Sequence, residues 1–129
     1  PMKARELYLT DRDGSYQKGE DEDLRSIVEG ITGFKGRVHL HFADELHGAF
    51  DDAEQLAEAI DRSIVLGIEP YPTFDEAEQI AMGQQRPSAM TQTVKAAFDG
   101  ALNALTEPER PFYLMQYANQ ARNRRAFSN

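Results

Sequence analysis

Residues 37–43 place the strongest constraint on the fold of this chain, because apolar and polar side chains alternate there with a period of two. The apolar face would carry Val38, Leu40 and Phe42, and the polar face Arg37, His39 and His41. This pattern predicts a β-strand. A strand needs neighbours in a sheet, yet the only other candidate is the short stretch 5–9. The sequence therefore predicts a small sheet of which part is missing.

Most of the remaining chain carries helical signals. Apolar side chains spaced by three, four and seven predict a helix over residues 24–31. Three capping boxes mark the starts of further helices, at Asp52 with Gln55, Thr73 with Glu76, and Thr106 with Glu109. The longest apolar stripe runs over residues 90–105, and prolines 70, 72 and 87 separate the helices. These signals predict an α/β or α+β fold in which one or two short strands precede four to five helices.

The length and the charge limit the domain count and the partners. A chain of 129 residues suits a single unit, with a strand–helix–strand part over 1–50 and a helical part over 51–129. Cysteine is absent, which excludes disulfides and thiolate metal sites. The net charge of −8 argues against binding nucleic acid through its phosphates, and against broad contact with an anionic membrane. No apolar run approaches the roughly 20 residues that cross a bilayer, so a cytoplasmic chain is expected.

A series of segments follows a recognisable order along the chain. The central one, residues 33–42, reads as a glycine, lysine–glycine, valine–histidine strand. The others are 3–7 and 16–24 before it, the helix 56–64, the proline-centred turn 71–73, and a closing tyrosine–alanine–asparagine at 117–119 with Arg122 and Asn123. In this order the segments resemble the C-terminal region of bacterial 1-acylglycerol-3-phosphate acyltransferase-like proteins, which are glycerolipid acyltransferases.

The resemblance implies a function for a parent protein. Such enzymes transfer an acyl group from acyl-CoA or acyl carrier protein to a lysophospholipid hydroxyl, without a cofactor, in phospholipid synthesis. Their catalytic His-x-x-x-x-Asp pair and Pro-Glu-Gly segment lie upstream of the region resembled, and this chain has no Pro-Glu-Gly. We therefore expect an incomplete part of a larger acyltransferase fold, inactive alone, which meets donor and acceptor through the rest of the parent chain. The resemblance places that parent at the inner face of the inner membrane.

Four residues match the catalytic spacing within this chain. His39 with Asp44, and His47 with Asp52, are both His-x-x-x-x-Asp pairs, in which the histidine would act as general base. Three histidines among 22 acidic residues also make such matches expected by chance. His39 and His41 share one face of the predicted strand, a spacing that suits a zinc or manganese site. The alternative is a polar sheet face covered by another part of the protein.

The basic residues cluster near the C-terminal end of the chain. Arg122, Arg124 and Arg125 are candidates for contact with a phosphate or a membrane surface. The alternative is an exposed helix end, where cations are favoured by the helix dipole. The stripe over residues 90–105 is a candidate acyl-binding or interfacial surface, with packing into the core as the alternative.

Three hypotheses follow for the function of the chain. It is the C-terminal portion of an acyltransferase, a stand-alone acidic protein-interaction module without catalysis, or a small metal-binding protein that uses His39 and His41. An open edge beside residues 38–42, or a large exposed apolar face, would favour an incomplete part of a larger assembly. A closed and fully covered core would favour a self-contained module. Residue 1 is proline rather than methionine, which fits either a processed end or a fragment boundary.

Overall fold

The computed structural model describes residues 1–84 and 86–128, and over these residues it contains helices and no strand. The six helices are α1 (Met2–Asp13), α2 (Glu22–Thr32), α3 (Ala53–Gly67), α4 (Pro72–Ala81), α5 (Gln92–Asn103) and α6 (Arg110–Ser128). The predicted α/β or α+β fold is therefore wrong, and with it the incomplete acyltransferase sheet.

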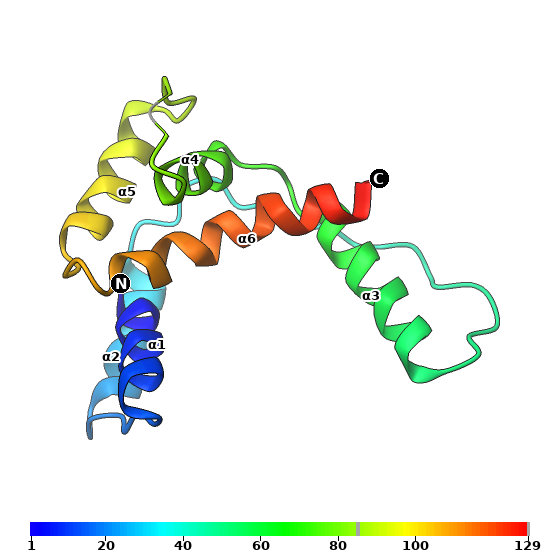
Figure 1. Cartoon of the computed structure of the whole chain (residues 1–129), viewed down its shortest axis with the longest axis horizontal. Coiled ribbons are helices and arrows are strands. Elements are labelled where there is room, and N and C mark those ends of the chain that lie inside the picture. Colours follow the sequence, from blue (N-terminus) through cyan, green and yellow to red (C-terminus); the bar gives the residue numbers. More distant parts are fainter. Residues whose placement is uncertain (85, 129) are drawn as a thin grey trace.

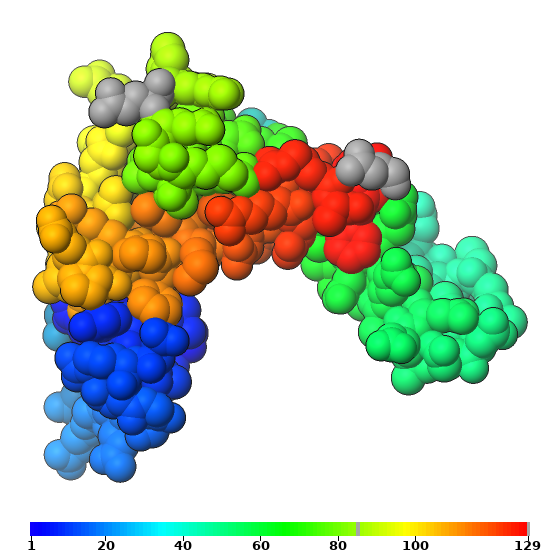
Figure 2. Space-filling model, viewed as in Figure 1, coloured from blue at the N-terminus to red at the C-terminus, as the bar shows by residue number. Residues whose placement is uncertain are grey.

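The helices build an arch rather than a ball (Figure 1). α6, the longest helix at 19 residues, forms the span, and α4 packs along it. α1 and α2, joined by the loop 14–21, form one limb, and α3 forms the other. The space-filling view shows both limbs extending to the same side of the span (Figure 2). Each limb therefore has much of its surface turned away from the rest of the chain.

The core lies where α4, α5 and the first turns of α6 meet. Ala77 and Ala118 are fully buried, and two such small side chains let α4 and α6 approach closely. The ring of Phe98 in α5 lies 5.5 Å from that of Tyr113 and 5.7 Å from that of Tyr117, centroid to centroid. The buried cluster comprises Ala4, Ala77, Phe98, Leu105, Tyr113, Leu114 and Ala118. The apolar stripe over residues 90–105 thus contributes Phe98 and Leu105 to the core.

Buried carboxylates join α1 and α4 to α6. Glu109, just before α6, is 5% exposed and accepts a hydrogen bond from Arg5 Nε of α1 at 2.9 Å. Arg5 holds the pKa of Glu109 below its usual range, chiefly through this hydrogen bond. Glu78 of α4 is 8% exposed and pairs with arginines of α6. Both carboxylates therefore have the charged partners that burial requires.

Two of the three predicted capping boxes lie at helix starts. Asp52 caps α3, its carboxylate accepting a hydrogen bond from the amide of Gln55 at 2.8 Å. Before α6, Glu109 Oε2 accepts a hydrogen bond from the amide of Thr106 at 2.8 Å. The box at Thr73 is wrong, because α4 begins one residue earlier at Pro72, whose missing amide hydrogen costs little in the first turn.

The predicted strand at 5–9 is part of α1. Residues 4 and 8, four apart, carry the contacts of this segment: Ala4 is fully buried, and the ring of Tyr8 lies 6.0 Å from that of Phe112. A spacing of four is helical, and it outweighs the two-residue spacing of Leu7 and Leu9. Gly14 then ends α1 with φ 77°, the left-handed conformation that favours glycine.

The predicted strand at 37–43 is an irregular segment without regular secondary structure. The described part of the chain offers it no neighbouring strand, so no ladder forms. The alternation of side chains nevertheless has a structural counterpart. Arg37 pairs with Glu69, in the link between α3 and α4. The ring of His41 lies so close to Gly67, the last residue of α3, that a Cβ there would collide with it. The polar side of the segment therefore contacts the end of α3 and the link that follows. The predicted strand–helix–strand part over 1–50 is thus two helices and an irregular segment.

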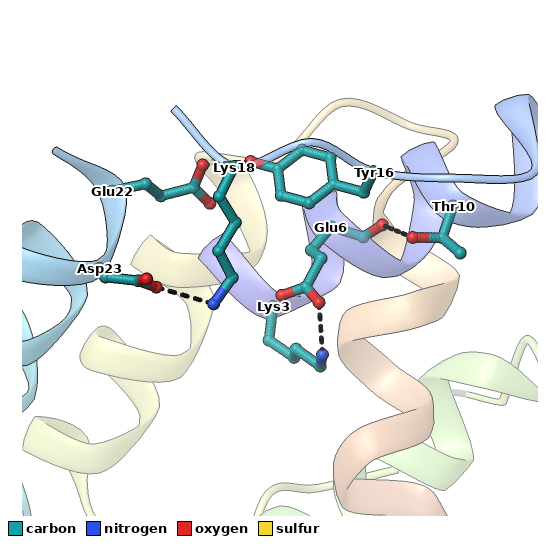
Figure 3. A network of polar contacts seen from close by, with 7 residues as sticks. All are labelled: Lys3, Glu6, Thr10, Tyr16, Lys18, Glu22 and Asp23. Carbon is teal, nitrogen blue, oxygen red and sulfur yellow. Dashed lines mark hydrogen bonds and ion pairs between the residues drawn. The ribbon is translucent and has the colours of Figure 1, made fainter. Parts of the chain in front are cut away.

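Polar contacts fix the turn between α1 and α2 (Figure 3). Glu22 Oε2 accepts hydrogen bonds from the Tyr16 hydroxyl at 2.5 Å and from the Gly19 amide at 3.1 Å. The Tyr16 bond lowers the pKa of Glu22, and the same bond raises the pKa of Tyr16. Lys18 pairs with Asp23 at 2.7 Å in the first turn of α2. Short-range polar contacts, rather than an apolar face, therefore set the start of α2.

Candidate functional site

The apolar stripe of α2 lies on the surface instead of in the core. Leu24, Ile27, Val28 and Ile31 are between 49% and 74% exposed. No other helix in the described residues makes a broad contact with α2. The periodicity that predicted this helix is correct, but the stripe has no counterpart within the chain. An amphipathic helix of this kind gains stability when its apolar face is covered.

The irregular segment that follows α2 in the chain also exposes apolar side chains. Its polar side contacts the chain, whereas Val38, Leu40 and Phe42 are 75% to 84% exposed. Phe34 between the two elements is 62% exposed. We call this set the apolar surface: Leu24, Ile27, Val28, Ile31, Phe34, Val38, Leu40 and Phe42. Exposed apolar groups in such numbers mark interaction sites rather than ordinary surface.

The candidate catalytic histidines do not meet their predicted partners. No hydrogen bond or ion pair joins His39 to Asp44, or His47 to Asp52, over residues 1–84 and 86–128. His39 instead has its Nδ1 atom 3.7 Å from Glu69 Oε2. Asp52 is occupied as the cap of α3. The geometry thus supplies no oriented pair of general base and carboxylate.

The two histidines of the candidate metal site do lie side by side. The rings of His39 and His41 are stacked, 6.3 Å apart and inclined by 14°. Among the described residues, no group of three or more histidine or carboxylate side chains is close enough to hold an ion. The pair is therefore short of the ligands that a closed site uses.

The C-terminal arginines all make contacts within the chain. Arg122 Nε and Arg125 Nη2 lie 3.2 and 2.6 Å from Glu78 Oε1. Arg125 first, and then Arg122, hold the pKa of Glu78 below its usual range despite its burial. Arg124 donates to the backbone carbonyl oxygens of Leu66 and Ile68 at 3.0 and 2.8 Å. These contacts tie α6 to α4 and to the end of α3, which gives each arginine a structural role.

A cavity of about 790 Å³ opens where α4, α5 and α6 meet the segment 34–37. Its walls are mainly aromatic and aliphatic, with Phe74, Phe98 and Tyr117 among them. Lys35 and Arg37 line it from the segment after α2, and no aspartate or glutamate is among the described residues that line it. This volume and this lining are typical of small-molecule sites.

Tyr71 lines this cavity and also a second one beside the C-terminal half of α6. Its ring lies 5.8 Å from that of Phe74, and the Arg37 guanidinium is 5.8 Å from its centroid. Its hydroxyl is buried and makes no hydrogen bond within the described part of the chain. Buried hydroxyls almost always have a partner, so one without deserves an explanation.

Sequence reasoning missed the cavity because its lining comes from distant parts of the chain. Tyr71 entered only as part of a turn, and Lys35 only as part of the segment 33–42 that carries the family resemblance. One signal was present: Lys35 and Arg37 are two cations two residues apart in a chain of net charge −8.

In the part of the chain described, no helix combines the length and hydropathy needed to cross a bilayer. No protein-family model, no curated protein and no solved structure matches the chain.

Proposed function

We propose that this chain is a helical interaction module, which works by burying its apolar surface against another protein surface rather than by catalysis. The observation that carries the proposal is the orientation of residues 37–42. Their polar side chains contact the chain, and their apolar side chains face outward. A self-contained fold would reverse this arrangement, because burial of apolar side chains is the main favourable term in folding.

The surface area supports the same conclusion. The structure exposes 9487 Å². A compact monomer of 14.5 kDa exposes about 6,900 Å², so the excess is about 2,600 Å². A standard protein–protein interface buries about 800 Å² on each partner, and obligate interfaces bury more. The excess of exposed surface area is therefore large enough for an obligate interface.

A protein is the occupant that the charges favour. The net charge of −8 repels phosphate backbones and anionic lipid headgroups. The arginines that could contact a membrane, Arg122, Arg124 and Arg125, already donate to groups of the chain itself. The covering protein surface is either a separate subunit or another part of a longer polypeptide, and the chemistry of the contact is the same for both.

Acyl transfer, the activity implied by the family resemblance, stays a prediction, as do its donor, its acceptor and its place at the inner membrane. Both the acyltransferase hypothesis and the module hypothesis expect no transfer when acyl-CoA and a lysophospholipid are added to this chain alone. A test of acyl transfer therefore uses a longer polypeptide that contains this chain.

Site-specific photocrosslinking in cells tests the proposal. A photoreactive amino acid at Ile27 samples the apolar surface, and the same residue at Arg25 samples another position on α2. We expect a protein crosslink from position 27 that is several times stronger than from position 25. The mass of the product separates a second copy, a different subunit and an intramolecular contact in a longer chain. Equal yields at the two positions, or crosslinks to lipid only, would overturn the proposal.

A further inference from the structure

The cavity between α4, α5 and α6 has a lining that differs from the rest of this chain. Twenty-two of 129 residues are acidic, yet none of the described residues that line the cavity is an aspartate or glutamate. Two cations do line it, Lys35 and Arg37. The lining thus carries cationic but no acidic side chains in a chain whose net charge is −8, and this contrast points to an anionic ligand.

The two cations are not equivalent. Arg37 is already paired with Glu69, which neutralises much of its charge. Lys35 has no ion pair within the described residues. Lys35 is therefore the group with charge to offer to a ligand, and a lysine ammonium offers three hydrogen-bond donors.

The aromatic lining of the cavity indicates what the uncharged part of the ligand would be. The rings of Phe98, Tyr113 and Tyr117 pack with centroids 5.2 to 5.7 Å apart, and all three residues line the cavity. Phe98 and Tyr113 are only 4% and 5% exposed, so the half-buried Tyr117 and Phe74 present most of the aromatic surface. Burial raises the pKa of Tyr113, so its hydroxyl stays protonated. Aromatic walls of this kind stack flat, apolar bodies, and about 790 Å³ accommodates a small molecule.

We propose that this cavity binds a small organic carboxylate with a flat aromatic body, with Lys35 at the carboxylate and the rings of Phe74 and Tyr117 against the body. The cavity adjoins the apolar surface through Phe34, which belongs to both, but the proposal does not depend on the protein-interaction function.

Titration of the full chain with 2-naphthoate tests the proposal, with the neutral 2-naphthamide as the matched probe. Backbone amide shifts of the ¹⁵N-labelled chain report the position of binding. A ligand of this size is expected to bind with a Kd on the order of 100 µM. We expect the carboxylate to bind about 5- to 10-fold more tightly than the amide, because a charge-assisted hydrogen bond is the stronger one.

Two pairs of variants locate the site. Ala97 and Ala96 are both exposed on α5, but only Ala97 lines the cavity. Ala97→Trp should therefore abolish binding, and Ala96→Trp should not. Lys35→Gln should remove the preference for the carboxylate, whereas Lys18→Gln, in the α1–α2 turn, should keep it.

Each result bears on the proposal. Shifts at Ala97, Phe98 and Tyr117, lost only in Ala97→Trp, support it. Shifts confined to α2 would mean that the probe binds the apolar surface, and would overturn it. Equal affinity for carboxylate and amide in the unmodified chain would refute the role of Lys35. The site itself would be refuted if 2-naphthoate showed no detectable binding at 5 mM, roughly fifty times the expected Kd.

Discussion

Replacing Ile31 by alanine tests whether the apolar stripe of α2 is exposed in the isolated chain. Ile31 is 74% exposed. Full burial of an isoleucine side chain contributes about 1.5 to 3 kcal/mol, so the buried quarter contributes about 0.4 to 0.8 kcal/mol. Alanine recovers a few tenths of a kcal/mol through its higher helix propensity. We therefore expect Ile31→Ala to change the free energy of unfolding by less than about 0.5 kcal/mol.

Leu105→Ala is the matched substitution in the core. Leu105 is 3% exposed, and removing a buried leucine side chain costs about 2 to 5 kcal/mol. Urea unfolding followed by circular dichroism at 222 nm gives both free energies, at a concentration where sedimentation shows the dissociated chain. A cost above about 2 kcal/mol for Ile31→Ala would mean that the chain covers the stripe itself. The surface proposed for a partner would then not exist.

Three further predictions concern the polar contacts. Glu78→Gln should lower the free energy of unfolding by about 1 to 3 kcal/mol, because it weakens the contacts of Arg122 and Arg125 with a buried group; urea unfolding measures this loss, and no change would contradict it. Arginines lower the folded-state pKa of Glu78 and of Glu109. The stability that these two carboxylates contribute is therefore present above the unfolded-state pKa of about 4.3 and lost as the pH falls through the lower folded-state values. Unfolding free energies that do not fall between pH 5 and pH 2 would refute this. Asp52→Ala should cost about 1 kcal/mol and speed amide exchange in the first turn of α3, which Asp52 caps, whereas the exposed mid-helix change Asp61→Ala should leave that exchange unaltered.

Helices after residue 20 were predicted from the sequence because their signals are local, whereas α1 was predicted as a strand. The stripe over residues 24–31 and the cap at Asp52 act within one or two turns of a single helix, and both predictions agree with the structure. Contacts far apart in the sequence were not predictable in this way. Arg5 with Glu109, and Glu78 with Arg125, lie 104 and 47 residues apart, and no pattern in the sequence joins them.

The strand prediction failed for a physical reason that the sequence itself contained. Alternation of apolar and polar side chains indicates which residues lie on the same side of an extended segment, but not whether a neighbouring strand exists. In residues 37–43 Arg37 pairs with Glu69, the ring of His41 lies close to Gly67, and the apolar side chains are exposed. The cavity was missed for a related reason, since its lining combines a loop with three helices.

The attachment of α3 at one end has a mechanical consequence. Arg124 holds the carbonyl oxygens of Leu66 and Ile68, at the C-terminal end of α3, while the N-terminal half of α3 is exposed. The helix has 15 residues and is therefore about 22 Å long. Because α3 is held near its C-terminal end, a rotation of about 10° there would move its N-terminal end by about 4 Å. A rotation of this size at the α3–α6 contact, in which Arg124 takes part, would therefore change the width of the opening between the two limbs of the arch.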